Sequence, residues 1–287
     1  MSIVKILVPV SGGANDAVAL ATAFAAAKPF AAHVAAVFIH PDPREAVPYG
    51  ELGLSPEVVQ NLIDCARDVS AQALKAARAS FVAQATEADA RIVAAPVKNT
   101  SMTCSLTERT ARLSSQLEEE AKLADLVVFP PLELPESSEM QDAFIRILTS
   151  AKRPVLLSPK TMPASVGRHI AVGWDGGFAA AHALTAALPF LLKAEAVELL
   201  SVGDEPDTGQ TGEAVRYLSL HAIAATHRNA RLEGRGIPQA LLAAAAEGNC
   251  DLLVIGGYGH SRTRETIFGG VTNYIVSHAE LPVLMVH

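Results

Sequence analysis

The chain alternates between short apolar runs and longer stretches in which apolar residues recur at helical spacing. In the second half these segments follow one another as residues 169–174, 179–192, 196–202, 212–225, 230–233, 238–247, 251–255, 270–279 and 283–286. Apart from a weak run at 230–233, the runs are mostly apolar, which is typical of strands buried on both faces of a parallel sheet. Strands that alternate with helices in this way predict an α/β fold with right-handed crossovers.

The same order of elements occurs twice along the chain. Three pairs of segments match in sequence, namely residues 5–13 with 169–177, 124–129 with 250–255, and 153–157 with 281–285. The first pair is an apolar strand that ends in a polar residue and two glycines. Three matches in the same order indicate an internal repeat. We therefore expect two tandem α/β domains, each with a five-stranded parallel sheet and helices on both faces.

The two copies differ in length. The first pair of matching segments is displaced by 164 residues and the second by 126, so the first copy holds the difference, 38 residues, between its first and fourth strands. We expect most of this excess near residues 41–55 and in the helix that follows. A linker containing Pro, Ser and Lys at residues 158–167 places the domains at residues 1–158 and 168–287.

The strongest chemical signal follows the fourth strand of the second copy. Gly256 and Gly259 come directly after the strand, and Gly269 and Gly270 open the last helix after nine intervening residues. Glycines let a ligand approach the backbone closely, and free N–H groups at a helix start form an anion site. Thr272 would add a hydroxyl. The alternative is that these glycines only permit tight turns and close packing.

This spacing resembles the nucleotide signature of the universal stress protein family, G-x-x-G, nine residues, G-[S/T], at Gly256, Gly259 and Gly269. The resemblance covers the whole chain as a tandem of two Rossmann-like domains of the adenine nucleotide alpha hydrolase type. It implies phosphate contacts around Gly270, Val271 and Thr272. One departure is that Gly270 stands where the family's ATP binders usually have Ser or Thr, so that Thr272 would have to substitute.

The resemblance implies further contacts. Asp175 occupies the family's acidic position against the ribose, and Val202 matches the backbone position that reads adenine. Their alternative interpretations are a helix N-cap and an ordinary core valine. Arg262 could clamp phosphates, or belong to a solvated loop. The family's closing strands pair across a dyad, so we expect residues 155–157 and 283–286 to pair within this chain.

The first copy departs from this pattern. Ser11 replaces the aspartate, and Pro130 and Pro131 replace the glycines, with Glu133 and Glu136 close behind. Prolines remove backbone donors and the carboxylates repel phosphate. We expect this copy to be a scaffold or regulatory domain that does not hold ATP in the family manner.

Composition, charge and cysteine spacing argue against several classes of protein. The 287 residues carry a formal net charge of −7, whereas nucleic-acid binders usually carry a basic field. Three scattered cysteines without a CxxC pair predict neither a disulfide framework nor a zinc site. The chain opens directly into an apolar strand and contains no apolar stretch of membrane-spanning length. We therefore expect a cytoplasmic protein that binds neither nucleic acid nor membrane.

We thus expect a stress-response protein that binds an adenine nucleotide, ATP with or without Mg²⁺, in its second domain and acts as a sensor or regulator. A second copy or another protein is the expected macromolecular partner. The absence of a G-x-x-x-x-G-K-[S/T] motif and of an arranged base predicts at most slow ATP hydrolysis. Two alternatives stay open. One is a nucleotide-free dimerising member of the same family. The other is an ATP pyrophosphatase, because residues 11–16 approximate its S-G-G-x-D-S loop.

Overall fold

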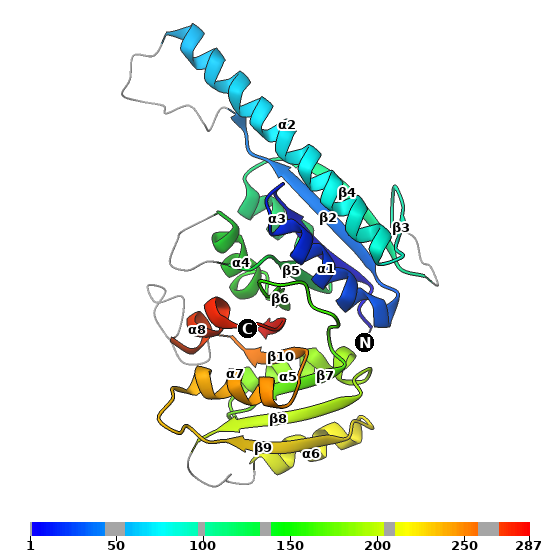
Figure 1. Cartoon of the computed structure of the whole chain (residues 1–287), viewed down its shortest axis with the longest axis vertical. Coiled ribbons are helices and arrows are strands. Elements are labelled where there is room, and N and C mark those ends of the chain that lie inside the picture. Colours follow the sequence, from blue (N-terminus) through cyan, green and yellow to red (C-terminus); the bar gives the residue numbers. More distant parts are fainter. Residues whose placement is uncertain (1, 44–54, 97–100, 133–138, 204–209, 258–269) are drawn as a thin grey trace.

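A computed structural model describes residues 2–43, 55–96, 101–132, 139–203, 210–257 and 270–287. Within these residues the strands form one twisted sheet of eleven strands (Figure 1). The strands of the first half are β1 (Lys5–Val10), β2 (His33–His40), β3 (Arg91–Ile92), β4 (Thr103–Thr110), β5 (Leu126–Phe129) and β6 (Val155–Leu157). Those of the second half are β7 (His169–Gly173), β8 (Ala196–Val202), β9 (Ala225–Ala230), β10 (Leu252–Gly256) and β11 (Val283–Val286).

The strand order makes the internal repeat visible. The order is β3-β4-β2-β1-β5-β6 in the first half, continued by β11-β10-β7-β8-β9 in the second. All neighbours are parallel except β6 and β11, which pair antiparallel, with Leu157 opposite Val283 and Val155 opposite Met285. The expected pairing of the two closing strands within one chain is therefore confirmed. The carboxyl ends of the two sets of parallel strands point in opposite directions.

Two sequence expectations need correction. The first half contains the additional two-residue strand β3 beside β4, so six of its described segments are strands rather than five. The third strand of the second half is β9 at Ala225–Ala230, not residues 230–233. β9 lies at the edge of the sheet and contains Thr226, His227 and Arg228, so it lacks the apolar run that marks a buried strand.

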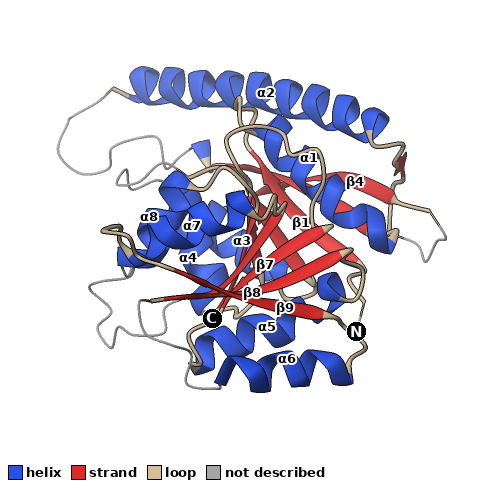
Figure 2. Ribbon diagram, turned by 60° about the horizontal axis from the view of Figure 1, so that its bottom comes forward, coloured by secondary structure: helices blue, strands red, loops and turns tan. Residues whose placement is uncertain are grey.

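Helices cover both faces of the sheet (Figure 2). One buried cluster joins the strands to the helices α1 (Asp16–Ala27), α2 (Pro56–Glu87), α5 (Phe178–Leu191) and α6 (Gln210–Leu220), with the 3-10 helix η1 (Lys28–Phe30) at the end of α1. The opposite cluster contains residues from α3 (Leu113–Ala121), α4 (Glu139–Thr149), α7 (Ile237–Glu247) and α8 (Gly270–His278). Both clusters include residues from the two halves, so the halves share a core on each face of the sheet.

The extra length of the first half lies mainly in α2, as expected. α2 has 32 residues, whereas α6, which lies between the corresponding strands of the second half, has 11. α2 runs along the outside and projects beyond the rest of the protein (Figure 1). Even so, no helix in the described ranges is both long and apolar enough to cross a membrane.

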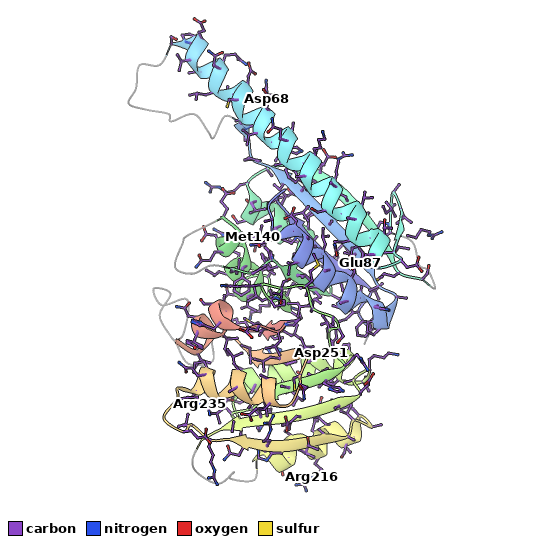
Figure 3. The ribbon with its side chains drawn as sticks, viewed as in Figure 1. Asp68, Glu87, Met140, Arg216, Arg235 and Asp251 are labelled. Carbon is purple, nitrogen blue, oxygen red and sulfur yellow. The ribbon has the colours of Figure 1, made fainter. Side chains whose placement is uncertain are left out.

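In both halves an aspartate carboxylate accepts hydrogen bonds from backbone N–H groups at the start of a neighbouring strand. We call this contact the clamp. Asp125 Oδ2 accepts hydrogen bonds from the N–H groups of Val4 and Lys5, at 2.8 and 2.9 Å. Asp251 accepts hydrogen bonds from the N–H groups of residues 167, 168 and 169 at 3.1, 3.1 and 2.8 Å, and another from the hydroxyl of Ser165. Figure 3 labels Asp251 at this junction. Asp125 ties the start of β5 to the start of β1, and Asp251 ties the start of β10 to the start of β7.

Candidate functional site

The loop after β7 places Asp175 at the carboxyl edge of the sheet. Asp175 is exposed, and its Oδ1 accepts a 2.8 Å hydrogen bond from the N–H of Gly177. Gly176 between them has a φ of +74°, which glycine adopts without steric cost. The N-cap of α5 is Gly177, without a side-chain cap. Asp175 is therefore not the N-cap itself. It braces the loop while its carboxylate stays at the surface.

Val202 and Gly256 end the neighbouring strands. The sheet order β10-β7-β8 brings Val202 at the end of β8, the loop of Asp175 after β7 and Gly256 at the end of β10 to one edge. Ligands bind at this edge in open parallel sheets. Val202 lies opposite Ala230 and is partly buried against the core, which also agrees with the core-valine interpretation.

Gly256 has a clear packing role. A Cβ at this position would lie 2.5 Å from the backbone carbonyl carbon of Ala179 and 2.6 Å from its oxygen. No side chain fits at that distance, so glycine is needed for the end of β10 to approach the first turn of α5. The close-packing interpretation therefore holds for Gly256. The same contact brings the start of the glycine-rich segment against the helix that follows Asp175.

The start of α8 is described only in part. Gly270 is its first residue and is exposed, and a Cβ there would meet nothing within 4 Å. Val271 is exposed, whereas Thr272 is buried, with 6% of its surface accessible. The sequence candidates Gly259, Gly269 and Arg262 lie outside the described residues.

The corresponding loop of the first half is filled by a side chain that sequence reasoning missed. Asp16 is buried, and its carboxylate accepts hydrogen bonds from Ser11 N at 3.0 Å, Gly12 N at 2.7 Å and Ser11 Oγ at 3.2 Å. Gly12 has a φ of +81°, like Gly176 in the second half. The residue in register with Asp16 is Ala180, whose methyl group cannot accept hydrogen bonds from the loop.

Electrostatics reinforce this difference between the halves. Burial raises the pKa of the Asp16 carboxyl, and the hydrogen bonds from Ser11 and Gly12 oppose that rise by stabilising the charged form. The backbone N–H groups of Ser11 and Gly12, which a bound anion would need as donors, are thus already used by this side chain. The sequence contains this difference, because Asp175 stands in place of Ser11 and Ala180 in place of Asp16. It becomes visible only when the two copies are aligned residue by residue.

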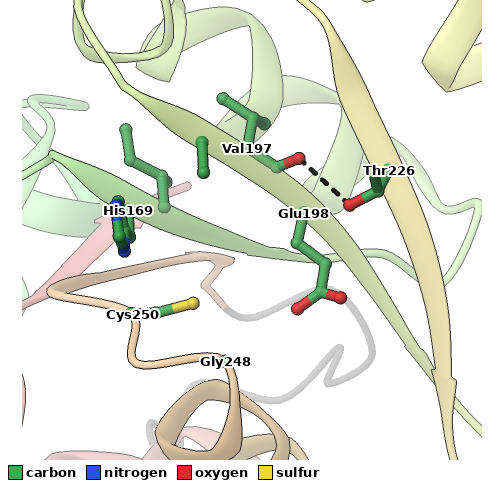
Figure 4. A pocket seen from close by; sticks show the side chains of 8 residues that line it. His169, Val197, Glu198, Thr226, Gly248 and Cys250 are labelled. Carbon is green, nitrogen blue, oxygen red and sulfur yellow. Dashed lines mark hydrogen bonds between the residues drawn. The ribbon is translucent and has the colours of Figure 1, made fainter.

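A cavity of about 200 Å³ lies elsewhere (Figure 4). It lies at the opposite ends of the strands from Asp175. The residues that line it are His169 and Ile170 of β7, Ala196, Val197 and Glu198 of β8, Thr226 of β9, and Gly248 and Cys250 between α7 and β10. Burial raises the pKa of the Cys250 thiol to about 11, so this thiol is neutral at physiological pH. Among the described side chains, no group of His, Cys, Asp and Glu could hold a metal ion.

The comparisons with known proteins fit this geometry. Residues 167–287 match the model of the universal stress protein family. A search of curated proteins finds no match.

Among solved structures, a universal stress protein from Archaeoglobus fulgidus aligns over 98% of this chain and 95% of its own, with 14% identity and a TM-score of 0.66. A protein described as a universal stress protein from Pseudomonas aeruginosa aligns over 99% and 93%, with 17% identity and a TM-score of 0.51. A shorter universal stress protein, in complex with cAMP, aligns over 42% and 97%, with 20% identity and a TM-score of 0.35.

The two long alignments show that the tandem fold extends over the whole chain, and the family match identifies one copy. The α/β architecture of the chain agrees with both. Residues 167–287 thus form a domain of the universal stress protein family, within a chain that has the tandem fold of such proteins.

Proposed function

We propose that the second half of the chain binds an adenine nucleotide, with ATP as the leading candidate, and that the protein acts as a cytoplasmic stress sensor or regulator. The observation that carries this proposal is the contrast between the two β–α loops. In the second half Asp175 lies exposed beside the end of β10, where the glycine-rich segment begins. In the first half the same loop holds the buried carboxylate of Asp16.

Each proposed contact has a chemical reason. The Asp175 carboxylate would accept the ribose hydroxyls, and the backbone at Val202 would pair with adenine. The N–H groups of Gly269, Gly270 and Val271 would face the phosphates at the start of α8, with Arg262 as a charged donor. A Mg²⁺ ion would be held largely by the phosphates themselves, because this cation prefers phosphate and water oxygens. The sequence has no G-x-x-x-x-G-K-[S/T] motif, so we expect at most slow hydrolysis.

A second candidate function is a nucleotide-free interaction protein of the same family. The burial of Thr272 favours it, because that hydroxyl was the expected substitute for the serine or threonine missing at Gly270. The pyrophosphatase alternative receives less support. Its phosphate-binding loop would be residues 11–16, where the carboxylate of Asp16 already accepts the N–H groups of Ser11 and Gly12 and would repel phosphate.

Replacing Asp175 with alanine is expected to weaken ATP binding by about 5- to 150-fold, or about 1–3 kcal/mol, through loss of charged hydrogen bonds. Trp174, the only tryptophan in the chain, precedes Asp175 directly and provides a fluorescence signal for the titration. Glu213→Ala, at an exposed position of α6, is the matched control and should leave the affinity unchanged. An unchanged affinity in Asp175→Ala together with a lowered melting temperature would limit Asp175 to bracing its loop.

A further inference from the structure

A largely apolar seam follows the outer side of α2. Its residues are spaced alternately by four and three positions, as Val58, Leu62, Cys65, Val69, Gln72, Ala76, Ala79 and Ala83. All eight are exposed, including Val58, Leu62 and Val69 with 42%, 38% and 61% of their surfaces accessible. Alternate spacing by three and four residues is the heptad pattern of a coiled-coil seam. The seam extends over about seven turns of the helix, or about 38 Å.

This seam is separate from the face that attaches α2 to the sheet. The buried residues of α2 are Ala77, Phe81, Gln84 and Ala85. The helix is also held by a 2.8 Å hydrogen bond between Ser70 Oγ and His40 Nδ1 and by an ion pair between Arg78 and Glu108. The amino-terminal half buries none of its described residues and projects beyond the protein (Figure 1). A projecting helix with an exposed seam gains stability from a partner rather than from its own chain.

We propose that the α2 seam pairs in antiparallel fashion with the α2 seam of a second copy of this chain. The larger apolar residues lie in the projecting half of the helix, and three alanines lie in the attached half. Antiparallel pairing brings the large residues of one copy against the small residues of the other. Because of the two-fold axis, each such contact occurs twice in the dimer. The register that uses all eight positions pairs Val58 with Ala83, Leu62 with Ala79, Cys65 with Ala76 and Val69 with Gln72.

The polar residue of the seam lies next to the two-fold axis in this register. Gln72 of each copy faces Val69 of the other, and the two Gln72 positions are about 4.5 Å apart along the seam. A glutamine amide both donates and accepts hydrogen bonds, so the two Gln72 side chains can satisfy each other across the axis. One polar residue within an apolar seam costs stability and restricts the pairings that are available.

Charges beside the seam select the same register. Asp68 and Lys75 are exposed, lie seven residues apart on one flank of the seam, and form no ion pair with any described residue. Figure 3 labels Asp68 on the projecting part of α2. In the proposed register Asp68 of each copy faces Lys75 of the other. A shift by one heptad in either direction would bring Asp68 against Asp68 or Lys75 against Lys75. Such like-charge contacts disfavour the shifted pairings.

The oligomeric state of the full chain, measured by sedimentation equilibrium over a concentration series, tests this pairing. We expect a dimer for the natural sequence and a monomer for Val69→Asp, whose position is exposed in the single chain and should not disturb its fold. Lys75→Asp should raise the dimer dissociation constant about 10-fold or more, because two attractive pairs become repulsive. The double variant Asp68→Lys/Lys75→Asp should restore the dimer.

Cysteine chemistry tests the orientation. In the antiparallel register the two Cys65 side chains lie about 16 Å apart along the seam, so mild oxidation should not join two natural chains. Ala76→Cys places a second thiol in the layer of Cys65 and should give disulfide-linked dimers. Cross-linking of the natural chain through Cys65 would indicate parallel pairing and overturn the proposal. A natural chain that stays monomeric at its highest soluble concentration, or a dimer that survives Val69→Asp, would also overturn it.

Discussion

Replacing Asp251 with alanine is expected to lower the free energy of unfolding by about 3 kcal/mol. The carboxylate accepts hydrogen bonds from three consecutive backbone N–H groups, residues 167 to 169, and from the hydroxyl of Ser165. Removing it leaves these donors without their partner at the point where β7 and β10 begin. The loss should therefore fall on the whole second half rather than on one loop.

Denaturant unfolding, followed by circular dichroism, measures this change. Asp125→Ala is the matched variant in the first half, where the clamp accepts two N–H groups, and should cost about half as much. Asp251→Asn, which keeps one acceptor oxygen, should lie between the natural protein and the alanine variant. If Asp251→Ala costs no more than an ordinary surface substitution, water replaces the carboxylate and the clamp is not a stabilising feature.

Replacing Gly269 with valine is expected to reduce ATP binding at least 100-fold, because a branched side chain at the proposed helix start would obstruct the phosphates and the backbone they contact. The adjacent position provides the contrast. A Cβ at Gly270 meets no described atom within 4 Å, so Gly270→Ser should be accommodated. It would add the hydroxyl that the resemblance places there, and binding should be retained or tightened.

Titration calorimetry on both variants measures the effect, with circular dichroism to verify folding. Pro131→Ala, at the position of the first half that corresponds to Gly257, is the matched control and should leave binding unchanged. Full affinity in Gly269→Val would remove Gly269 from the nucleotide site, whereas absence of ATP binding by the folded natural protein would favour the nucleotide-free interaction protein.

Much of the fold could be predicted because buried parallel strands produce apolar runs. The strands β7 and β10 and the repeat are visible in this way, whereas the β6–β11 pairing was expected from the family resemblance. The edge strand β9 could not be located, because Thr226, His227 and Arg228 lie at the edge of the sheet, where polar residues are tolerated. The additional strand β3 has only two residues, too few for any periodicity.

The site was predictable to a smaller extent. The positions of Asp175, Val202 and Gly256 at one edge follow from strand order alone. Other features depend on contacts between segments that sequence spacing does not reveal. These include the closeness of Gly256 to Ala179, the burial of Thr272, and the carboxylate of Asp16 in the loop of the first half. The last of these decides how the two halves differ.

The number of ATP molecules bound per chain tests the central claim most directly. Calorimetric titration of the natural protein is expected to give one site per chain, because Asp16 fills the loop in the first half and the second half has Ala180, without a carboxylate, at that position. Two equivalent sites, or no binding heat at millimolar ATP with the fold verified, would contradict this account.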